Sequence, residues 1–168
     1  YARARDSVYD LDVRGGHVVA GAGDRVLALD PATLKEVDSC HVGETVWSVD
    51  VDADGLVALA TESIAGVCDP STGKLNKDGG RRSMPYQVQW SPDGQRLAIA
   101  DEDVVELYEV TRGVDGAVAL GGHTAEVTAV AMSSAGVTAS ADDDGTILAW
   151  RDDGLPLWAA IKTFASEY

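Results

Sequence analysis

Short apolar segments recur along the chain, separated by turns of small and polar residues. Four of these segments begin 38, 39 and 42 residues apart, and the glycines of the turns that follow them are 39, 39 and 42 residues apart. Two independent features with nearly the same spacing indicate an internal repeat. The four segments and their glycines are Val8–Val13 with Gly16, Val46–Val51 with Gly55, Pro85–Trp90 with Gly94, and Val127–Met132 with Gly136.

Each repeat continues with two further apolar segments and then a weaker fourth one, which is clearest at 36–42 and 155–161. The breaks between them, such as Asp30-Pro31 and the segment 69–73, have the composition of turns. No long segment has the periodicity of an amphipathic helix, although a weak helical end is expected over 159–168. The pattern therefore predicts an all-β chain with four short strands in about forty residues of each repeat.

Four strands per repeat of this length are typical of the blade of a β-propeller. We treat residues 1–168 as one propeller region built of four-stranded antiparallel blades. The expected blades and the C-terminal tail are 8–42, 45–80, 84–121, 122–161 and 162–168.

The last repeat resembles a WD repeat, because it has Gly122-His123 at its start, Asp144-Gly145 in a turn and Trp150 at the end of its third strand. The resemblance implies a buried hydrogen-bond chain through His123, Ser140, Asp144 and Trp150. The third repeat adds the turn Ser91–Gly94 that often accompanies the motif. The other repeats depart from the motif at the position of the Trp, where they have Leu29, Cys68 and Tyr108.

A propeller normally closes into a ring, which leaves no exposed strand edge. The resemblance implies a ring of seven or eight blades, whereas four are expected here. Three arrangements stay open: a portion of a longer propeller, a ring completed by a second copy or another subunit, and a lone four-bladed ring. The last repeat contains its own fourth strand at 155–161, which argues against the lone ring.

The charge of the chain restricts its partners. Its 168 residues include 13 basic and 28 acidic ones, which gives a net charge of −15 and an isoelectric point of about 4.3. Such a chain repels phosphate, so direct binding of nucleic acid or of an anionic membrane is not expected. No apolar run reaches the roughly 18–20 residues of a membrane helix. A basic or peptide-like protein segment is the expected partner.

The two cysteines, Cys40 and Cys68, are too few for a disulfide framework. One bridge between them can form, but two buried free thiols are the favoured interpretation. Free thiols fit an intracellular, cytoplasmic location.

No segment of the sequence matches a catalytic or metal-binding motif in full. The segment 50–55 resembles the opening of a calcium loop, but the twelfth position is Thr61 instead of a bidentate Glu, so a turn is expected. Cys40-His41 lacks further ligands nearby in sequence, and no nucleophile elbow, phosphate loop or zinc-protease motif is present. We therefore expect no catalytic residue, no cofactor and no metal. The segment 23–33 resembles a quinoprotein propeller repeat, which makes a propeller enzyme a distant alternative.

A stronger signal for a binding site comes from one position that the four repeats share. It lies at the start of the first strand of each repeat, and it is occupied by three aromatic residues and a threonine. The resemblance implies that first strands open on the face where partners dock, with two acidic residues bordering the patch. The alternative is that the aromatic side chains fill the packing between blades. The predicted surface consists of Tyr9, Trp47, Tyr86, Thr128, Glu126 and Asp143.

The expected function is that of a non-catalytic scaffold, which presents this face of a rigid propeller to a protein partner. The main alternative is a structural subunit or propeller fragment packed inside a large multi-protein assembly. Fold alone does not decide between these roles.

Overall fold

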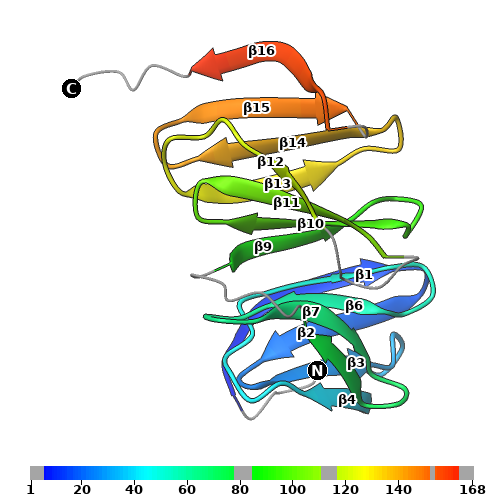
Figure 1. Cartoon of the computed structure of the whole chain (residues 1–168). Coiled ribbons are helices and arrows are strands. Elements are labelled where there is room, and N and C mark those ends of the chain that lie inside the picture. Colours follow the sequence, from blue (N-terminus) through cyan, green and yellow to red (C-terminus); the bar gives the residue numbers. More distant parts are fainter. Residues whose placement is uncertain (1–5, 78–84, 111–116, 152–153, 163–168) are drawn as a thin grey trace.

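The computed structural model describes residues 6–77, 85–110, 117–151 and 154–162, and these form sixteen strands in four sheets (Figure 1). Each sheet has four antiparallel strands that neighbour one another in chain order, so each is a simple meander. Each sheet packs against the next one in the sequence, and the first and the last sheet lie toward opposite ends of the molecule in Figure 1. The all-β prediction and the four-stranded repeat are confirmed.

The first two sheets comprise the N-terminal half of the chain. Their strands are β1 (Val8–Arg14), β2 (His17–Ala22), β3 (Arg25–Leu29), β4 (Glu36–His41), β5 (Ser48–Val51), β6 (Val57–Ala60), β7 (Ala65–Asp69) and β8 (Lys74–Lys77).

The last two sheets follow the same plan. Their strands are β9 (Pro85–Trp90), β10 (Arg96–Asp101), β11 (Val104–Glu109), β12 (Val118–Leu120), β13 (Val127–Met132), β14 (Val137–Asp142), β15 (Thr146–Arg151) and β16 (Pro156–Lys162). We call the four sheets blades 1 to 4, and their first strands, β1, β5, β9 and β13, the inner strands.

The expected helical end is wrong over 159–162, because this segment belongs to β16 and pairs with β15. Alternating backbone hydrogen bonds with a neighbouring strand outweigh the weak helical pattern there. The rest of that prediction, and most of the expected tail, lies outside the described residues.

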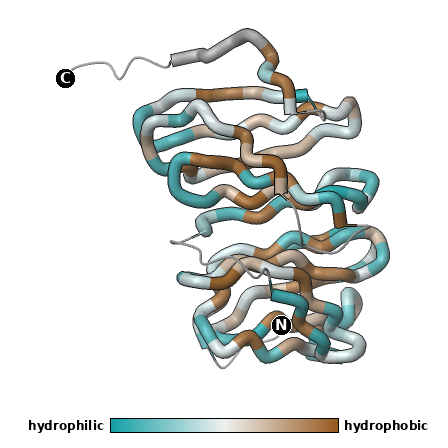
Figure 2. Tube along the Cα trace, in the orientation of Figure 1, coloured by the Kyte–Doolittle hydropathy of each residue, from teal (hydrophilic) through white to brown (hydrophobic). Residues whose placement is uncertain are grey.

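The core consists of three hydrophobic clusters, one at each junction between consecutive blades. Alternation along the strands supplies both faces of a blade. In β6, Val57 and Leu59 pack toward blade 1, while Ala58 and Ala60 pack toward blade 3. Figure 2 shows the hydrophobic segments running along the strands, with hydrophilic residues in many of the turns.

The prediction of two free thiols is wrong, because Cys40 and Cys68 form a disulfide with a Cα–Cα distance of 6.4 Å. Cys40 lies on β4 and Cys68 on β7, so the bridge joins the outer part of blade 1 to blade 2. Both residues are fully buried in the cluster between these blades. The argument from free thiols to an intracellular location therefore loses its premise.

No helix of the described residues is long and apolar enough to cross a membrane.

Candidate functional site

The four residues at the shared position lie where the inner strands begin, and in blades 1, 3 and 4 the strand pairing bulges there. The pairing of β1, β9 and β13 skips Tyr9, Tyr86 and Thr128. In blade 2 the Trp47 N–H donates to the carbonyl of Ala60, the residue that pairs with Ser48. A bulge re-aims a side chain out of the regular alternation. The structure accordingly leaves all four side chains exposed, with exposed fractions of 51% for Tyr9, 44% for Trp47 and 37% for Tyr86.

The three aromatic residues follow one another across blades 1 to 3, and we call them the aromatic row. The rings of Tyr9 and Trp47 meet edge to face, with centroids 4.7 Å apart and an interplanar angle of 64°. Trp47 and Tyr86 both line a pocket of about 330 Å³, together with Pro85, Thr61 and Glu62. The aromatic row is therefore a continuous apolar strip with a pocket in its second half.

Glu126 and Asp143 lie at the Tyr86 end of the aromatic row, and we call them the acidic end. The Tyr86 hydroxyl donates a hydrogen bond to Glu126, which raises the pKa of this tyrosine; slight burial and the charges of Glu126 and Asp143 add to the rise. The Asp143 N–H donates to the Glu126 carbonyl over 3.0 Å. The structure thus brings five of the six predicted residues together. The sixth, Thr128, is exposed at its bulge, but no contact given for the described residues links it to the others.

Sequence reasoning missed Glu44, which does not line the pocket but binds the lining residue Thr61. The Glu44 carboxylate accepts hydrogen bonds from the Thr61 hydroxyl over 2.6 Å, the Ser63 hydroxyl over 2.7 Å and the Ser63 N–H over 3.2 Å. These bonds, those from Thr61 and Ser63 above all, lower the pKa of Glu44. They fix the β6–β7 turn, and with it the exposed Glu62 at the rim of the pocket. The polar spacing Thr61-Glu62-Ser63 was the only signal in the sequence.

A ladder of side-chain hydrogen bonds ties the inner strands together. Asp10 accepts from the Val49 N–H and Asp12 from the Val51 N–H, both over 2.9 Å, and Gln87 accepts from the Val130 N–H over 2.8 Å. Each inner strand is the edge of its sheet, so its outward N–H groups need acceptors from elsewhere. The preceding blade provides them, at sequence separations of 39 to 43 residues. Sequence reasoning missed this ladder, although its residues follow the repeat.

Asp50 is the most perturbed acid of the ladder. Its side chain accepts from the Trp90 N–H and lies 3.5 Å from the Arg14 guanidinium. Burial, reinforced by a hydrogen bond with Asp12, raises the pKa of Asp50 to about 7. Burial also opposes ionisation of Asp12, but the hydrogen bonds from Asp50, Val51 and Val13 and the charge of Arg14 outweigh it and lower its pKa. The two carboxyls therefore share one proton near neutral pH.

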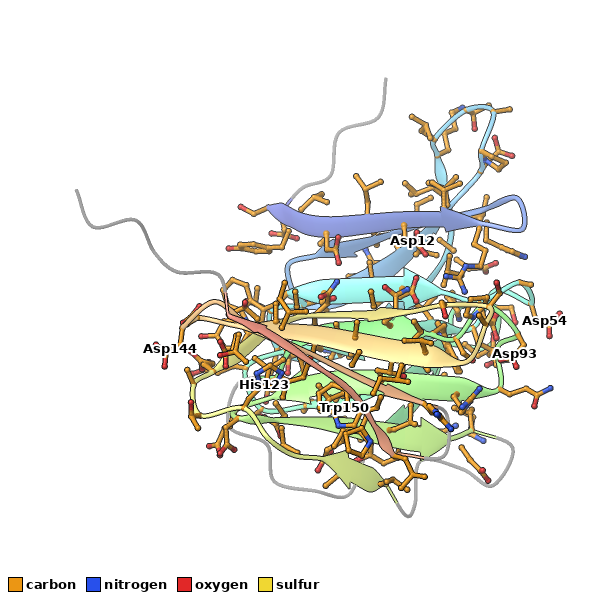
Figure 3. The ribbon with its side chains drawn as sticks, turned by 90° about the horizontal axis from the view of Figure 1, so that it is seen from above. Asp12, Asp54, Asp93, His123, Asp144 and Trp150 are labelled. Atoms are coloured by element: carbon orange, nitrogen blue, oxygen red, sulfur yellow. A yellow bond between two sulfur atoms is a disulfide. The ribbon has the colours of Figure 1, made fainter. Side chains whose placement is uncertain are left out.

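Part of the hydrogen-bond chain expected in blade 4 is present, with Asp142 in the place expected for Asp144. His123 Nδ1 lies 2.8 Å from Asp142 and His123 Nε2 lies 2.6 Å from the Ser140 hydroxyl, all of them buried. The buried Trp150 ring has its centroid 6.0 Å from that of His123. The side chain of Asp144 is not part of the chain, because it is exposed in the β14–β15 turn (Figure 3).

Strand alternation explains why Asp142, and not Asp144, binds His123. Ser140 and Asp142 are two residues apart on β14 and share a face, whereas Asp144 follows the end of that strand. Burial disfavours the charge of Asp142, but hydrogen bonds from His123 and from the N–H of Thr146 and Asp144 outweigh burial and lower its pKa. Asp142 therefore joins the start of blade 4 to its β14–β15 turn.

The two segments that suggested other chemistry consist of strand residues and turns, since 23–33 contains β3 and 50–55 begins at the end of β5. The Asp52 carboxylate accepts from the N–H groups of Asp54 and Leu56, over 2.9 and 2.8 Å, within the calcium-like segment. In the segment 23–33, Asp30 accepts from the N–H and the hydroxyl of Thr33, each over 2.7 Å. Over the part of the chain that the structure describes, no group of three or more His, Cys, Asp or Glu residues is arranged to hold a metal ion.

Comparison with known proteins agrees with this geometry. The family model described as "WD domain, G-beta repeat" matches residues 117–151, which contain the His123 chain. The chain belongs to the WD-repeat family. It is 33% identical over 142 residues to the cell division cycle protein cdt2 of Schizosaccharomyces pombe, a match that covers 74% of this chain and 29% of that protein.

Two solved structures of the WD-repeat fold superpose on this chain. "Structure of U3-55K" and "Crystal structure of RRP9 WD40 repeats" each match with a TM-score of 0.80 and 16% identity, over 93% of this chain and 52% of theirs. At this identity the likeness shows the fold alone. The chain thus spans about half of each solved relative and less than a third of the curated one.

Proposed function

We propose that this chain is a non-catalytic WD-repeat scaffold that binds a basic protein segment along the aromatic row and its acidic end. The observation that carries the proposal is the exposure of Tyr9, Trp47 and Tyr86 in one strip, which runs on to Glu126 and Asp143. Exposed aromatic clusters of this kind are typical of the energetic centre of protein interfaces.

The strands that carry the aromatic row are held in place by hydrogen bonds, which favours binding. Bulges hold Tyr9 and Tyr86 at the start of their strands, and a backbone hydrogen bond to Ala60 holds Trp47. The side-chain ladder joins these strands across the blades. A partner therefore meets groups that are already ordered, and association costs less conformational entropy than it would on a mobile loop.

The pocket between Trp47 and Tyr86 fits a lysine or arginine side chain. Its walls are two aromatic rings and Pro85, which suit an aliphatic stem, and Glu62 stands at its rim. A cation beside aromatic faces and a carboxylate gains both cation–π and ionic stabilisation. The net charge of −15 attracts such a segment at long range.

The test uses a lysine- and arginine-rich peptide and a matched peptide in which glutamate replaces the basic residues. We expect calorimetry to show binding of the basic peptide only. Trp47→Ala and Tyr86→Ala should each weaken it about tenfold or more, with little change in melting temperature. The control is Val37→Ala, an exposed apolar residue on the outer strand β4. Equal affinity for both peptides, or unchanged affinity in the two aromatic variants, would refute the proposal.

The contribution of the acidic end is measured separately, through the rate of association. Replacing Glu126 by Gln together with Asp143 by Asn should slow association and flatten its dependence on salt, since charges at the rim of an interface act mainly on the association rate. Asp54→Asn is the matched control, because Asp54 lies at the opposite end of the strands from the β14–β15 turn (Figure 3). Stopped-flow fluorescence measures both rates. An equal effect of the control would mean that net charge alone steers the partner.

A second function, that of a structural subunit in a multi-protein assembly, is favoured by a different observation. The outward face of blade 1 is apolar and uncovered, with Leu11 and Val13 strongly exposed. Such a face suits a neighbouring blade, from further propeller sequence or from another subunit. Cross-linking through a cysteine placed at Val13 would identify that neighbour, and recovery of the uncross-linked chain alone would argue against this role.

A further inference from the structure

We infer that the pocket between Trp47 and Tyr86 selects a lysine whose side-chain nitrogen carries methyl groups, in preference to unmodified lysine or arginine. The inference rests on the proposed binding of a basic segment along the aromatic row, and it specifies the side chain that enters the pocket. The reason is that the side chains lining the pocket leave few hydrogen-bond acceptors for a ligand.

An unmodified lysine or arginine brings hydrogen-bond donors that need acceptors. Every nitrogen of a lysine ammonium or an arginine guanidinium carries N–H groups and no acceptor. When such a group leaves water, each donor without a new partner weakens binding. Methylation replaces N–H groups by methyl groups and retains the positive charge, so a trimethylated lysine needs no acceptor.

The hydroxyl of Thr61 lines the pocket, but it is already fully engaged. It donates to Glu44 over 2.6 Å, and its oxygen accepts from the N–H groups of Ile64 and Ser63 over 2.9 and 3.3 Å. Both lone pairs of the hydroxyl oxygen are therefore in use. Thr61 has no lone pair left for a hydrogen bond from a ligand.

The other lining side chains add one acceptor group. The Tyr86 hydroxyl is bound to Glu126, and the Trp47 indole has an N–H donor only. Pro85 has an apolar side chain, which leaves the exposed carboxylate of Glu62 at the rim. One carboxylate does not satisfy every donor of an ammonium or a guanidinium, but it attracts a methylated ammonium by its charge.

The two aromatic walls of the pocket are held in place by contacts outside it. The Trp47 ring packs edge to face against Tyr9, with centroids 4.7 Å apart, and the Tyr86 hydroxyl is tied to Glu126. Aromatic rings attract the positive charge of a quaternary ammonium, and its methyl groups gain dispersion contacts with them. Because the rings are already ordered, little conformational entropy is lost when such a head group enters.

The charge around the pocket favours a cation over a neutral apolar group. Glu44 lies behind Thr61, and the hydrogen bonds from Thr61 and Ser63 lower its pKa, so Glu44 is ionised at neutral pH. Lys77 offsets part of this charge, and Glu62 adds a second carboxylate at the rim. A methylated lysine keeps the positive charge that these carboxylates attract.

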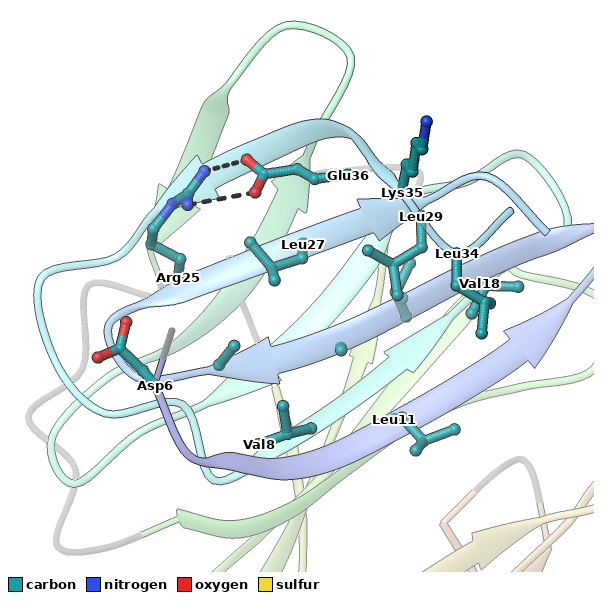
Figure 4. Close-up of a pocket in the computed structure, with 13 residues that line it drawn as sticks. Asp6, Val8, Leu11, Val18, Arg25, Leu27, Leu29, Leu34, Lys35 and Glu36 are labelled. Atoms are coloured by element: carbon teal, nitrogen blue, oxygen red, sulfur yellow. Dashed lines mark hydrogen bonds and ion pairs between the residues drawn. The ribbon is translucent and has the colours of Figure 1, made fainter. Parts of the chain in front are cut away.

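A larger hollow, of about 780 Å³, lies over the outward face of blade 1 but lacks the features that bind a cation (Figure 4). The described residues that line it are mainly aliphatic, such as Leu11, Leu27 and Leu29, and include no aromatic ring. Its Glu36 carboxylate is paired with Arg25. The pocket of about 330 Å³ is therefore the hollow that suits a methylated ammonium.

The experiment uses the full chain and four versions of a peptide with a single lysine among arginines. The lysine is unmodified, trimethylated, replaced by arginine, or replaced by a neutral analogue in which a tert-butyl group stands for the trimethylammonium. Calorimetry measures the four dissociation constants. We expect the trimethylated peptide to bind about fivefold more tightly than each of the others, which corresponds to a cation–π contact that costs no unpaired donor.

Trp47→Ala should remove the preference for the trimethylated peptide, and Tyr86→Ala replaces this variant if circular dichroism shows that it is not folded. Val37→Ala, an exposed apolar position on the outer strand β4, is the control and should keep the preference.

Three results would overturn the inference: equal affinity for the unmodified and trimethylated peptides, equal affinity for the trimethylated and neutral peptides, or a preference that persists without the Trp47 ring. The proposed function would survive the first of these if the unmodified peptide still binds and Trp47→Ala still weakens it. Failure of every peptide to bind would refute both the inference and the proposed function.

Discussion

The fold raises the pKa of the Asp50 carboxyl well above that of an ordinary aspartate. It is buried between inner strands, beside Arg14, Asp12, Gln89 and the N–H of Trp90. Burial and the hydrogen bond with Asp12 raise its pKa to about 7, while an aspartate in an unfolded chain releases its proton near pH 4. Between these values the folded state holds a proton that the unfolded state has lost.

The consequence is a defined dependence of stability on pH. Since the folded state binds more protons between about pH 4 and pH 7, the contribution of Asp50 to the free energy of unfolding falls as pH rises through this window. Asp50→Asn keeps an acceptor for the Trp90 N–H but cannot titrate. We therefore expect the variant to gain stability relative to the parent chain as pH increases from 4 to 7, measured by urea denaturation at each pH.

Asp54→Asn is the control for this experiment, because it removes an exposed acid from a turn of the same blade. It should change stability by less than about 0.5 kcal/mol at every pH. Parallel curves for Asp50→Asn and the parent chain would show that Asp50 is ionised throughout, contrary to our expectation.

At the scale of the element, the hydrogen-bond chain of blade 4 joins three parts of one sheet. His123 precedes β13, Ser140 and Asp142 lie on β14, and Asp142 also accepts from the Thr146 N–H that opens β15. Asp142→Ala would leave His123 Nδ1 and the Thr146 N–H without partners inside the protein. Because unsatisfied buried polar groups are costly, we expect a loss of about 2–3 kcal/mol in the free energy of unfolding.

Asp144→Ala is the matched variant two residues away, and it should cost less than about 0.5 kcal/mol because Asp144 is exposed. Chemical denaturation measures the free energy of unfolding of both variants and shows which aspartate supports the hydrogen-bond chain. A larger loss for Asp144→Ala than for Asp142→Ala would restore the assignment expected from the sequence.

The elements also show why the sequence predicted some features and not others. Repeat spacing and strand alternation are local, so they located the strands and the shared position of Tyr9, Trp47 and Tyr86. The ladder was missed because an acceptor such as Asp12 acts on Val51, on a strand whose position is known only once the blades are stacked. Asp144 was assigned from the resemblance to a WD repeat, although alternation from Ser140 points to Asp142.

At the scale of the whole molecule, the disulfide is the covalent link between two blades. Cys40 and Cys68 are 28 residues apart, a separation that does not match the repeat, because the outer strand of one blade lies beside the third strand of the next. Spacing alone therefore gave no reason to pair them. The bridge closes a loop that spans the junction of blades 1 and 2, and it restricts the unfolded chain more than the folded one.

We expect the double variant Cys40→Ala/Cys68→Ala to lose about 3 kcal/mol in the free energy of unfolding, since a loop of this length restricts the unfolded chain by roughly that much. Because both cysteines are fully buried, a mild reductant should act on the bridge only as fast as the junction opens. Thiol titration of the unfolded parent chain without reductant should find no free thiol. If it finds two, and the double variant is as stable as the parent, blades 1 and 2 are held together by packing alone.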